Sequence, residues 1–221
     1  MPAPDKLLMS ASVKSGKSLF DWPQSASPAP FPLLIFSGYL STIPVINFLS
    51  SPTGPVSQVL TPLLSSALHC ASNGVSSIEQ SPQKAVALLT LFYVFVVFIL
   101  SAIMSVTGQL LGNEEGYKNK EPRMNKRGVS NGLPHRMIAT HEALYDIFPV
   151  YAIAAALFIT MPSTQSTPSA STSLNALILH VFLKLFVYAP CYLLDIDLAR
   201  SYSHMCAVTA VLLAIWVVVV G

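Results

Sequence analysis

Charge is scarce in this sequence. Charged side chains make up 10% of the residues, against roughly 25% in soluble domains, while 52% are hydrophobic. The net charge is only +2, so the chain lacks a basic field and we expect no nucleic-acid partner. Cysteine is also rare, since Cys70, Cys191 and Cys206 are too few and too scattered for a disulfide framework or a zinc site. With a mean hydropathy of +0.59, these shortages predict an integral membrane protein.

Several catalytic signatures are missing as well. The sequence has no glycine-rich phosphate loop, no serine nucleophile elbow and no His-Glu-x-x-His pair. Asp195 and Asp197 carry oxygen ligands, but two carboxylates without a histidine at ligand spacing are weak evidence for a metal. We therefore predict no metal site, and any chemistry must come from other polar residues.

Four apolar segments predict the fold. Residues 85–112 carry no charged side chain and exceed the roughly 20 residues that cross a hydrocarbon core. Short connections join the remaining segments, which are residues 143–161, 174–194 and 202–221. Short connections favour antiparallel neighbours. We expect an all-α integral membrane fold in which residues 85–221 form a four-helix transmembrane bundle.

Basic residues in the loops predict the orientation of this bundle. The loop between the first two segments contains Lys118, Lys120, Arg123, Lys126, Arg127 and Arg136. The loop at residues 162–173 has no charge, so the basic loop is predicted to be cytosolic. Arg200, between the last two segments, falls on the same side. Two polar segments, residues 135–149 and 184–201, are therefore expected to meet at one membrane face.

Residues 1–84 form a Ser/Pro-rich N-terminal extension in this prediction, poorly ordered or partly helical. Residues 31–49 are moderately apolar but contain prolines and an asparagine. They either form an extra spanning helix or belong to a targeting extension or disordered leader. The many prolines and serines of residues 50–83 predict a linker.

Polar residues within the second segment point towards a site. Ionisable groups at membrane depth are energetically expensive and usually functional. At about 100° per residue, Ala139, Ala143 and Asp146 share one helical face, with Arg136 near its edge. Small residues on that face allow a neighbouring helix to approach, so Asp146 is expected to point at protein. Asp146 either belongs to a site or merely pairs with a basic residue.

A polar stripe marks the third segment. His180, Lys184, Tyr188 and Tyr192 recur every four residues on an otherwise apolar helix. Lys184 lies too far from the cytosolic end for easy snorkelling, so it needs an aqueous crevice or an internal partner such as Asp146 or a backbone carbonyl. His180 by itself is more often a satisfied core histidine.

The end of the third segment and the start of the fourth add further polar residues. Pro190 removes one backbone donor and is expected to bend the third helix. Just before the fourth segment, the hydroxyl of Ser201 is expected to cap the N-terminus of that helix. The guanidinium of Arg200 would then lie beside a helix N-terminus, an arrangement that favours anions, including a thiolate.

These motifs resemble those of one family, the membrane-associated proteins in eicosanoid and glutathione metabolism (MAPEG). Its second-helix motif, Arg-x-x-x-Ala-His-x-Asn-x-x-Glu-x-x-Pro, is similar to Arg136-x-x-Ala139-Thr140-His141-x-Ala143-x-x-Asp146-x-x-Pro149. Its third-helix ending resembles Tyr188-x-x-x-Tyr192 followed by Arg200-Ser201, and Glu121-Pro122-Arg123 resembles the Pro-Arg element of bacterial-type members. The resemblance covers residues 85–221, and residues 1–84 lie outside it.

The resemblance implies a homotrimer with glutathione sites between subunits near the cytosolic face. It assigns cofactor binding to Arg136, His141, Asp146, Lys184, Tyr188 and Tyr192, and catalysis to Arg200 and Ser201. Arg200 would stabilise the glutathione thiolate. The implied function is a glutathione-dependent transferase or peroxidase that acts on hydrophobic electrophiles from the bilayer, in the endoplasmic reticulum or another endomembrane.

Two departures keep other functions open. The family's Asn is Ala143 here, which removes an amide donor and acceptor, and its Glu is the shorter Asp146. The family also includes members that bind lipid without catalysis. The alternative is therefore a non-catalytic membrane lipid-binding or scaffold protein of the same fold. A proton or ion route along His180, Lys184 and Tyr188 is a third hypothesis.

Overall fold

The computed structural model describes residues 30–71, 82–114, 116–120, 122–160 and 167–220. All regular secondary structure in these ranges is helical, as predicted. Most of the expected N-terminal leader, Glu121 and much of the uncharged loop lie outside the described residues. Among the described residues, five helices are long and apolar enough to cross a membrane: Leu33–Ser50, Pro82–Gly112, Gly132–Ile159, Pro168–Leu193 and Asp197–Val220. The fold is thus compatible with a multi-pass membrane protein.

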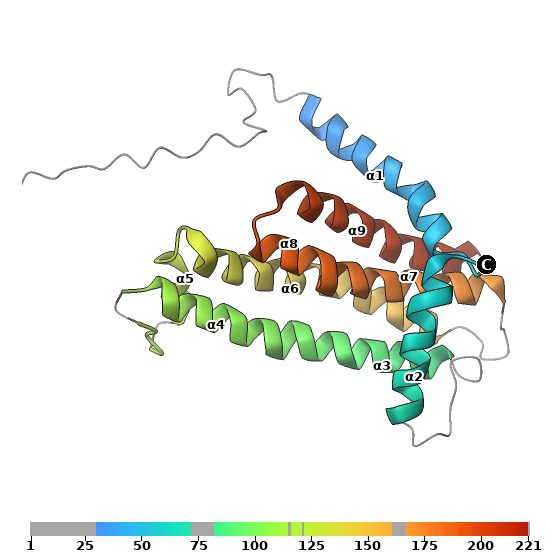
Figure 1. Ribbon diagram of the computed structural model, residues 1–221, viewed down its shortest axis with the longest axis horizontal. Coiled ribbons are helices and arrows are strands. Elements are labelled where there is room, and N and C mark those ends of the chain that lie inside the picture. The colour runs from blue at the N-terminus through green and yellow to red at the C-terminus, as the bar shows by residue number, and fades with distance from the viewer. Residues whose placement is uncertain (1–29, 72–81, 115, 121, 161–166, 221) are drawn as a thin grey trace, which may run out of the picture.

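The chain forms these spans from several helical elements (Figure 1). In chain order they are α1 (Pro30–Ser50), the π-helical turn η1 (Val56–Leu60), α2 (Thr61–Ala71), α3 (Pro82–Phe95), the π-helical turn η2 (Val96–Leu100), α4 (Ser101–Gly112), α5 (Pro122–Arg127), α6 (Gly132–Ile159), α7 (Pro168–Phe182), the π-helical turn η3 (Leu183–Tyr188), α8 (Ala189–Leu193) and α9 (Asp197–Val220). The predicted second segment began at residue 143, but α6 starts eleven positions earlier, at Gly132. The polar first half of α6 explains the difference, because hydropathy alone cannot recognise it.

Proline at position 190 coincides with a change in helical geometry. The preceding turn η3 is π-helical, and the N–H of Ala189 donates to the carbonyl of Lys184, five residues earlier. Pro190 itself has no N–H to donate, and the wider turn keeps the chain helical through this region. The third span therefore continues to Leu193.

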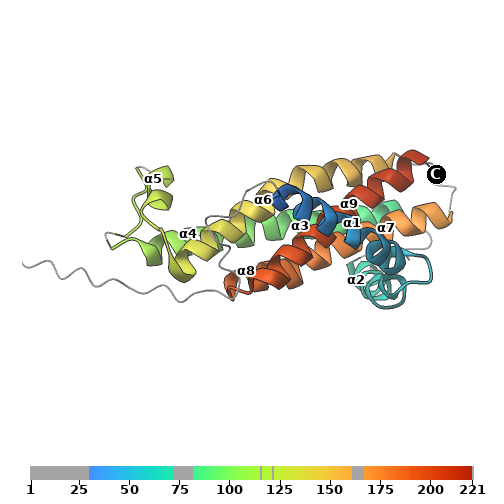
Figure 2. The same ribbon diagram turned by 90° about the horizontal axis from the view of Figure 1, so that it is seen from above.

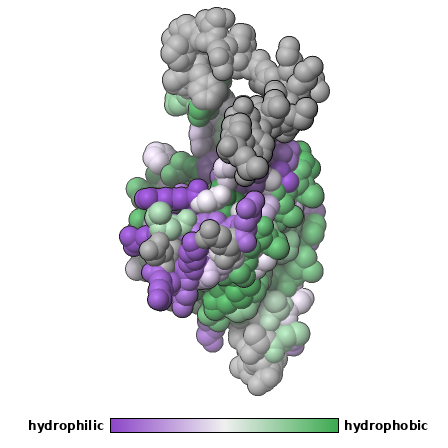
Figure 3. Space-filling model, turned by 90° about the vertical axis from the view of Figure 1, so that its left-hand side faces the viewer, coloured by the Kyte–Doolittle hydropathy of each residue, from purple (hydrophilic) through white to green (hydrophobic). Residues whose placement is uncertain are grey.

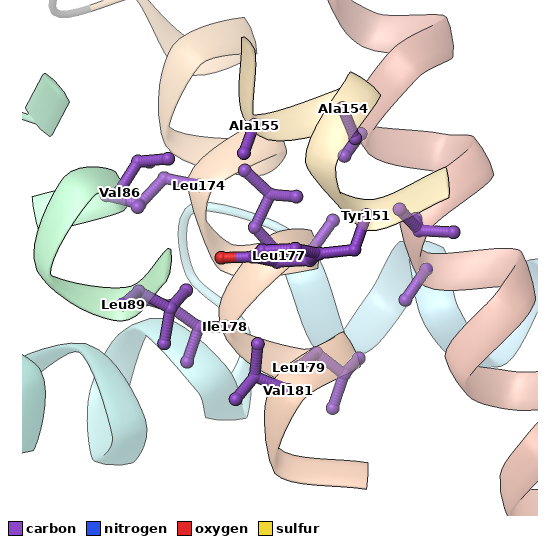
Figure 4. Packing of buried hydrophobic residues seen from close by; sticks show 14 of the residues in the cluster. Val86, Leu89, Tyr151, Ala154, Ala155, Leu174, Leu177, Ile178, Leu179 and Val181 are labelled. Carbon is purple, nitrogen blue, oxygen red and sulfur yellow. The ribbon is translucent and has the colours of Figure 1, made fainter. Parts of the chain in front are cut away.

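Helix α7 is the centre of the bundle. From Ser173 to Val181 every residue is buried, and a helix that is buried all round belongs to the interior of its fold. Figure 4 shows Leu174, Leu177 and Ile178 of this helix packed against Val86 and Leu89 of α3 and against side chains of α6. Helices α1, α3, α6 and α9 contact α7, most extensively α9, whereas α4 packs mainly on α6 (Figure 2 gives the view from above).

The N-terminal helix α1 packs on α9 through closely spaced small and polar residues. Residues Gly38, Thr42 and Ile46 recur every four positions, and a Cβ at Gly38 would lie 2.8 Å from the sulfur of Met205. The Thr42 and Thr209 hydroxyl oxygens are 2.6 Å apart and hydrogen-bonded. Small residues allow close helix approach in an apolar environment. The apolar segment at residues 31–49 is therefore helical and packs on the bundle.

The expected linker at residues 50–83 is wrong for its described part, because η1 and α2 are helical. Pro55 precedes η1, where a missing N–H costs little, and Pro62 follows the π-helical turn η1, whose wider geometry keeps the chain helical as η3 does before Pro190. Figure 1 shows α2 crossing the bundle near the end at which α7 begins. The Asn175 amide of α7 donates to the carbonyls of Ser50 at 3.1 Å and Ser51 at 3.3 Å, and accepts from Thr61 at 2.9 Å. One core side chain thus holds the corner between α1 and α2.

Replacing Asn175 with alanine should therefore destabilise this corner. Buried carbonyls would lose their donor, at a cost of about 1–3 kcal/mol. We expect a lower thermal unfolding midpoint in detergent and faster proteolysis between α1 and α2. Asn47→Ala is the matched control, since Asn47 is exposed on α1 and has no hydrogen bond within the described ranges. Equal unfolding midpoints for the two variants would contradict this role of Asn175.

Candidate functional site

The two predicted polar segments do meet, at the end of the bundle where α8 leads into α9. Arg136 of α6 donates from Nε to the carbonyl of Leu193 at 3.0 Å, and its Nη1 lies 3.1 Å from Asp195 Oδ2. Asp195 has a φ of 63°, a left-handed conformation that Asp tolerates better than most residues. Arg136 therefore holds the turn before α9 against α6.

Arg200 lies on the opposite side of this turn. Its Nη2 is 2.8 Å from Asp197 Oδ1, and its guanidinium lies over the Tyr192 ring at 4.7 Å from the ring centroid. The Arg200 side chain is 27% exposed, so it is sheltered but reachable from outside. Because α9 begins at Asp197, Ser201 lies inside the helix and is exposed, and the expectation that it caps α9 is wrong.

Lys184 finds a partner that the sequence did not reveal. The lysine is fully buried, and its Nζ lies 2.8 Å from Nδ1 of His204 on α9. The same Nζ lies 4.0 Å from the centroid of the Tyr188 ring, a cation–π distance. The expected partners, Asp146 or a carbonyl, are replaced by a histidine. Its signal was its position four residues after Arg200, on the same helical face.

The tyrosines connect Lys184 to Arg200. The Tyr188 ring packs edge-to-face on Tyr192 with centroids 5.7 Å apart, and it lies 5.5 Å from the His204 ring. Tyr192 in turn supports the Arg200 guanidinium. The structure thus brings Lys184, Tyr188, Tyr192 and Arg200 into one continuous cluster between the third and fourth spans.

His180 belongs to the core instead. Its Nδ1 lies 2.8 Å from the carbonyl of Ala207, and its Nε2 lies 3.4 Å from the hydroxyl of Tyr93. The ring stacks on Tyr151, whose hydroxyl is 3.1 Å from that of Thr90. Both ring nitrogens have partners, so His180 serves as a satisfied polar contact inside the bundle.

Two further predicted cofactor-binding residues lie on α6. His141 Nδ1 is 2.8 Å from the Ser101 hydroxyl, at the contact between α6 and α4. Asp146 is exposed and makes no hydrogen bond or ion pair with the residues that the structure describes. Its carboxylate lies close enough to Tyr188 to act on that side chain electrostatically, and the expectation that Asp146 points at protein stays a prediction. Ala143, on the face that also carries Arg136, is half-buried.

The surroundings of the cluster are polar at one end and apolar along the sides. Figure 3 views this end and shows hydrophilic residues framed by hydrophobic ones. The basic loop lies here too, with Lys126 of α5 paired to Glu142 of α6 at 2.8 Å. This distribution matches a bundle whose end faces water and whose flanks face hydrocarbon.

Charge pairing decides what this cluster can do chemically. Arg136 and Arg200 each have an aspartate, at half-exposed positions where ion pairs contribute little and exchange readily. A ligand carboxylate or thiolate can take the place of either aspartate. Lys184, by contrast, has no carboxylate partner in the described ranges. No group of three or more potential metal-ligating side chains occurs among the described residues.

Comparisons with protein-family models, curated proteins and solved structures find no match to this chain.

Removing the Arg136 side chain should loosen the turn before α9. Arg136→Ala loses the bonds to Leu193 and Asp195, so we expect roughly tenfold faster amide hydrogen exchange at residues 194–196. Arg127→Ala is the control, because Arg127 is exposed and contacts only the Met124 sulfur among described side chains. Unchanged exchange at residues 194–196 in Arg136→Ala would show that Arg136 does not hold the turn.

Proposed function

We propose that this protein is a membrane-embedded glutathione-dependent transferase or peroxidase that acts on hydrophobic electrophiles. The observation that carries the proposal is the convergence of Arg136, Tyr188, Tyr192 and Arg200 at the polar end of an apolar bundle. These residues come from the motifs that resemble the MAPEG family. Their convergence is what a site for an anionic thiol cofactor requires.

Arg200 would stabilise the thiolate of glutathione. A free thiol has a pKa of about 8.5, so a neighbouring guanidinium raises its ionised fraction at neutral pH. Arg200 lies in the first turns of α9, where the helix dipole also favours negative charge. Stacking on Tyr192 fixes the plane of the guanidinium, which leaves its edge available to a ligand.

The other polar groups would hold the rest of the cofactor. Glutathione has two carboxylates, and the planar guanidinium of Arg136 suits a carboxylate in place of Asp195. Its amino group needs an anion, for which exposed Asp146 is available. In the proposed homotrimer, Asp146 would meet a ligand held partly by the neighbouring copy. Ser201, exposed on α9 beside Arg200, would donate its hydroxyl to the reacting group. We place the enzyme in an endomembrane, with its polar end in the cytosol.

An apolar groove between α1 and α9 supports a hydrophobic co-substrate. The groove has a volume of about 870 Å³, within the range of roughly 300–1,000 Å³ that small-molecule sites occupy. Its walls include Phe36 and Leu40 of α1 and Leu212 and Trp216 of α9. On α9 the groove begins at Val208, about two turns beyond Arg200, so a co-substrate whose tail lies there would extend its reactive end along α9 to reach the polar cluster.

Arg200→Ala should lower the rate of glutathione conjugation to a generic electrophile by roughly a hundredfold, because the thiolate loses its cation. The measurement is conjugation by the purified protein in detergent. Asp197→Ala is the matched control: it breaks the same ion pair but keeps the guanidinium, so it should not slow the reaction. Equal rates for wild type and Arg200→Ala would remove Arg200 from the mechanism.

The groove supplies a second test. Leu212→Trp should fill part of it and exclude about two methylenes of a bound tail, which corresponds to close to a tenfold higher KM for a long-alkyl electrophile. The KM of a short electrophile should stay the same. Val220→Trp is the control, because Val220 is exposed on the same helix outside the groove. A rise in KM for both electrophiles, or for neither, would contradict tail binding in the groove.

The same groove favours one alternative function, a non-catalytic lipid-binding module. If this alternative is correct, lipid should co-purify with the protein, and millimolar glutathione should not raise the thermal unfolding midpoint of the protein. Stabilisation by glutathione that is lost in Arg200→Ala would reject it in favour of the enzyme.

A further inference from the structure

The buried pair of Lys184 and His204 is not explained by binding glutathione alone. A lysine without solvent contact and without a carboxylate among the described residues is costly to keep charged. Its closest polar partner is His204 Nδ1 at 2.8 Å. A neutral amine that accepts a hydrogen bond from the Nδ1–H of a neutral imidazole satisfies both groups at this distance.

His204 connects this lysine to the polar cluster. It lies four residues after Arg200 on α9, about 6 Å further along the helix axis and on the same face. The ring is half-buried, so one edge can be reached from outside the core. Its Nε2 has no hydrogen-bond partner in the part of the chain that the structure describes. A thiol held at Arg200 would therefore lie close to an unoccupied ring nitrogen.

We propose that His204 and Lys184 form a proton relay that takes the thiol proton of glutathione. This inference rests on the proposed function, since it names the base of that same site. The S–H bond breaks as the proton passes to His204 Nε2. The Nδ1–H proton of His204 moves to Lys184 Nζ at the same time. The products are a thiolate beside Arg200, a neutral imidazole and a buried ammonium.

The environment of Lys184 suits the ammonium that this step creates. The Tyr188 ring lies 4.0 Å below Nζ and offers its negative face to the cation. When the thiolate adds to an activated double bond, a C–S bond forms and the electron pair moves to the substrate carbon. The relay then returns the proton to that carbon, and both side chains regain their resting forms. Conjugated carbonyl compounds with an apolar tail are therefore the substrate class that the relay fits.

Other titratable groups around the pair must be considered in any pH-dependent measurement. On the span that carries Lys184 they are His180, Tyr188 and Tyr192, and on α9 they are Arg200 and Cys206. On the other helices they are Arg136, Asp146 and Tyr151 of α6, Tyr93 of α3 and Tyr39 of α1. None of their side chains is hydrogen-bonded or ion-paired to Lys184 or His204 among the described contacts, although His180 interacts electrostatically with both.

The experiment uses two variants that keep the packing. Lys184→Met preserves volume without the amine, and His204→Phe preserves the ring on Tyr188 without its nitrogens. Glutathione is titrated into each purified protein while thiolate absorbance is recorded, and conjugation rates are measured across pH. We expect glutathione binding to persist, thiolate absorbance at neutral pH to fall, and the rate to drop by about a hundredfold. Rates should recover as pH rises, because hydroxide can then ionise the thiol.

The outcomes distinguish failure of the proton relay from failure of the glutathione site as a whole. A purely structural role would lower the rate by the same factor at every pH, and that result would overturn the relay. Wild-type thiolate absorbance and an unshifted pH profile in either folded variant would also overturn it, while leaving glutathione chemistry intact. If wild-type protein shows neither glutathione binding nor thiolate absorbance, the proposed function fails and the relay fails with it.

Discussion

The arrangement of this bundle depends on one constraint: polar side chains of a fully buried helix must find partners on neighbouring helices. Residues 173–181 of α7 have no face towards water, and Lys184 of the following turn η3 is fully buried, so Ser173, Asn175, His180 and Lys184 cannot be hydrated. Ser173 donates to the Ala214 carbonyl at 3.1 Å, His180 contacts the Ala207 carbonyl, and Lys184 contacts His204. Each contact is made with α9, and together they fix the antiparallel alignment of the two spans.

That alignment determines where the site lies. With Lys184 opposite His204, the chain reverses at residues 194–196 and places Arg200 over Tyr192. Arg136 of α6 then reaches the same turn. If α9 were shifted by one turn along α7, His180 and Lys184 would lose their hydrogen-bond partners in an apolar interior. The free energy of folding would become less favourable by several kcal/mol. The position of Arg200 is therefore determined by the polar contacts between the third and fourth spans as much as by the turn itself.

Much of this architecture was predictable from the sequence, because uninterrupted apolar runs have few alternatives in a membrane. Four of the spans and the meeting of the two polar segments followed from hydropathy and loop charge, whereas the helix at residues 31–49 remained one of several alternatives. Helices η1 and α2 were missed because their serines and prolines resemble a linker, although Pro55 precedes the helical run and Pro62 follows a π-helical turn that accommodates it. His204 was missed because its role depends on which helix faces α7, a tertiary contact that spacing within one segment cannot reveal.

The charges near the turn also explain why the proposed site would ionise a bound thiol with an internal base. The two arginines alone provide little net positive charge, because each is paired with an aspartate. Arg136 and Arg200 already have Asp195 and Asp197, so the cluster attracts an anion only after exchanging one of these exposed carboxylates. Ionising a thiol by releasing its proton to water would add a net negative charge at the edge of a low-dielectric bundle. Moving that proton to Lys184 instead creates a thiolate and an ammonium within one cluster, and the net charge stays constant. In the proposed site, this balance of charge depends on Lys184 and His204 and needs no side-chain amide at Ala143.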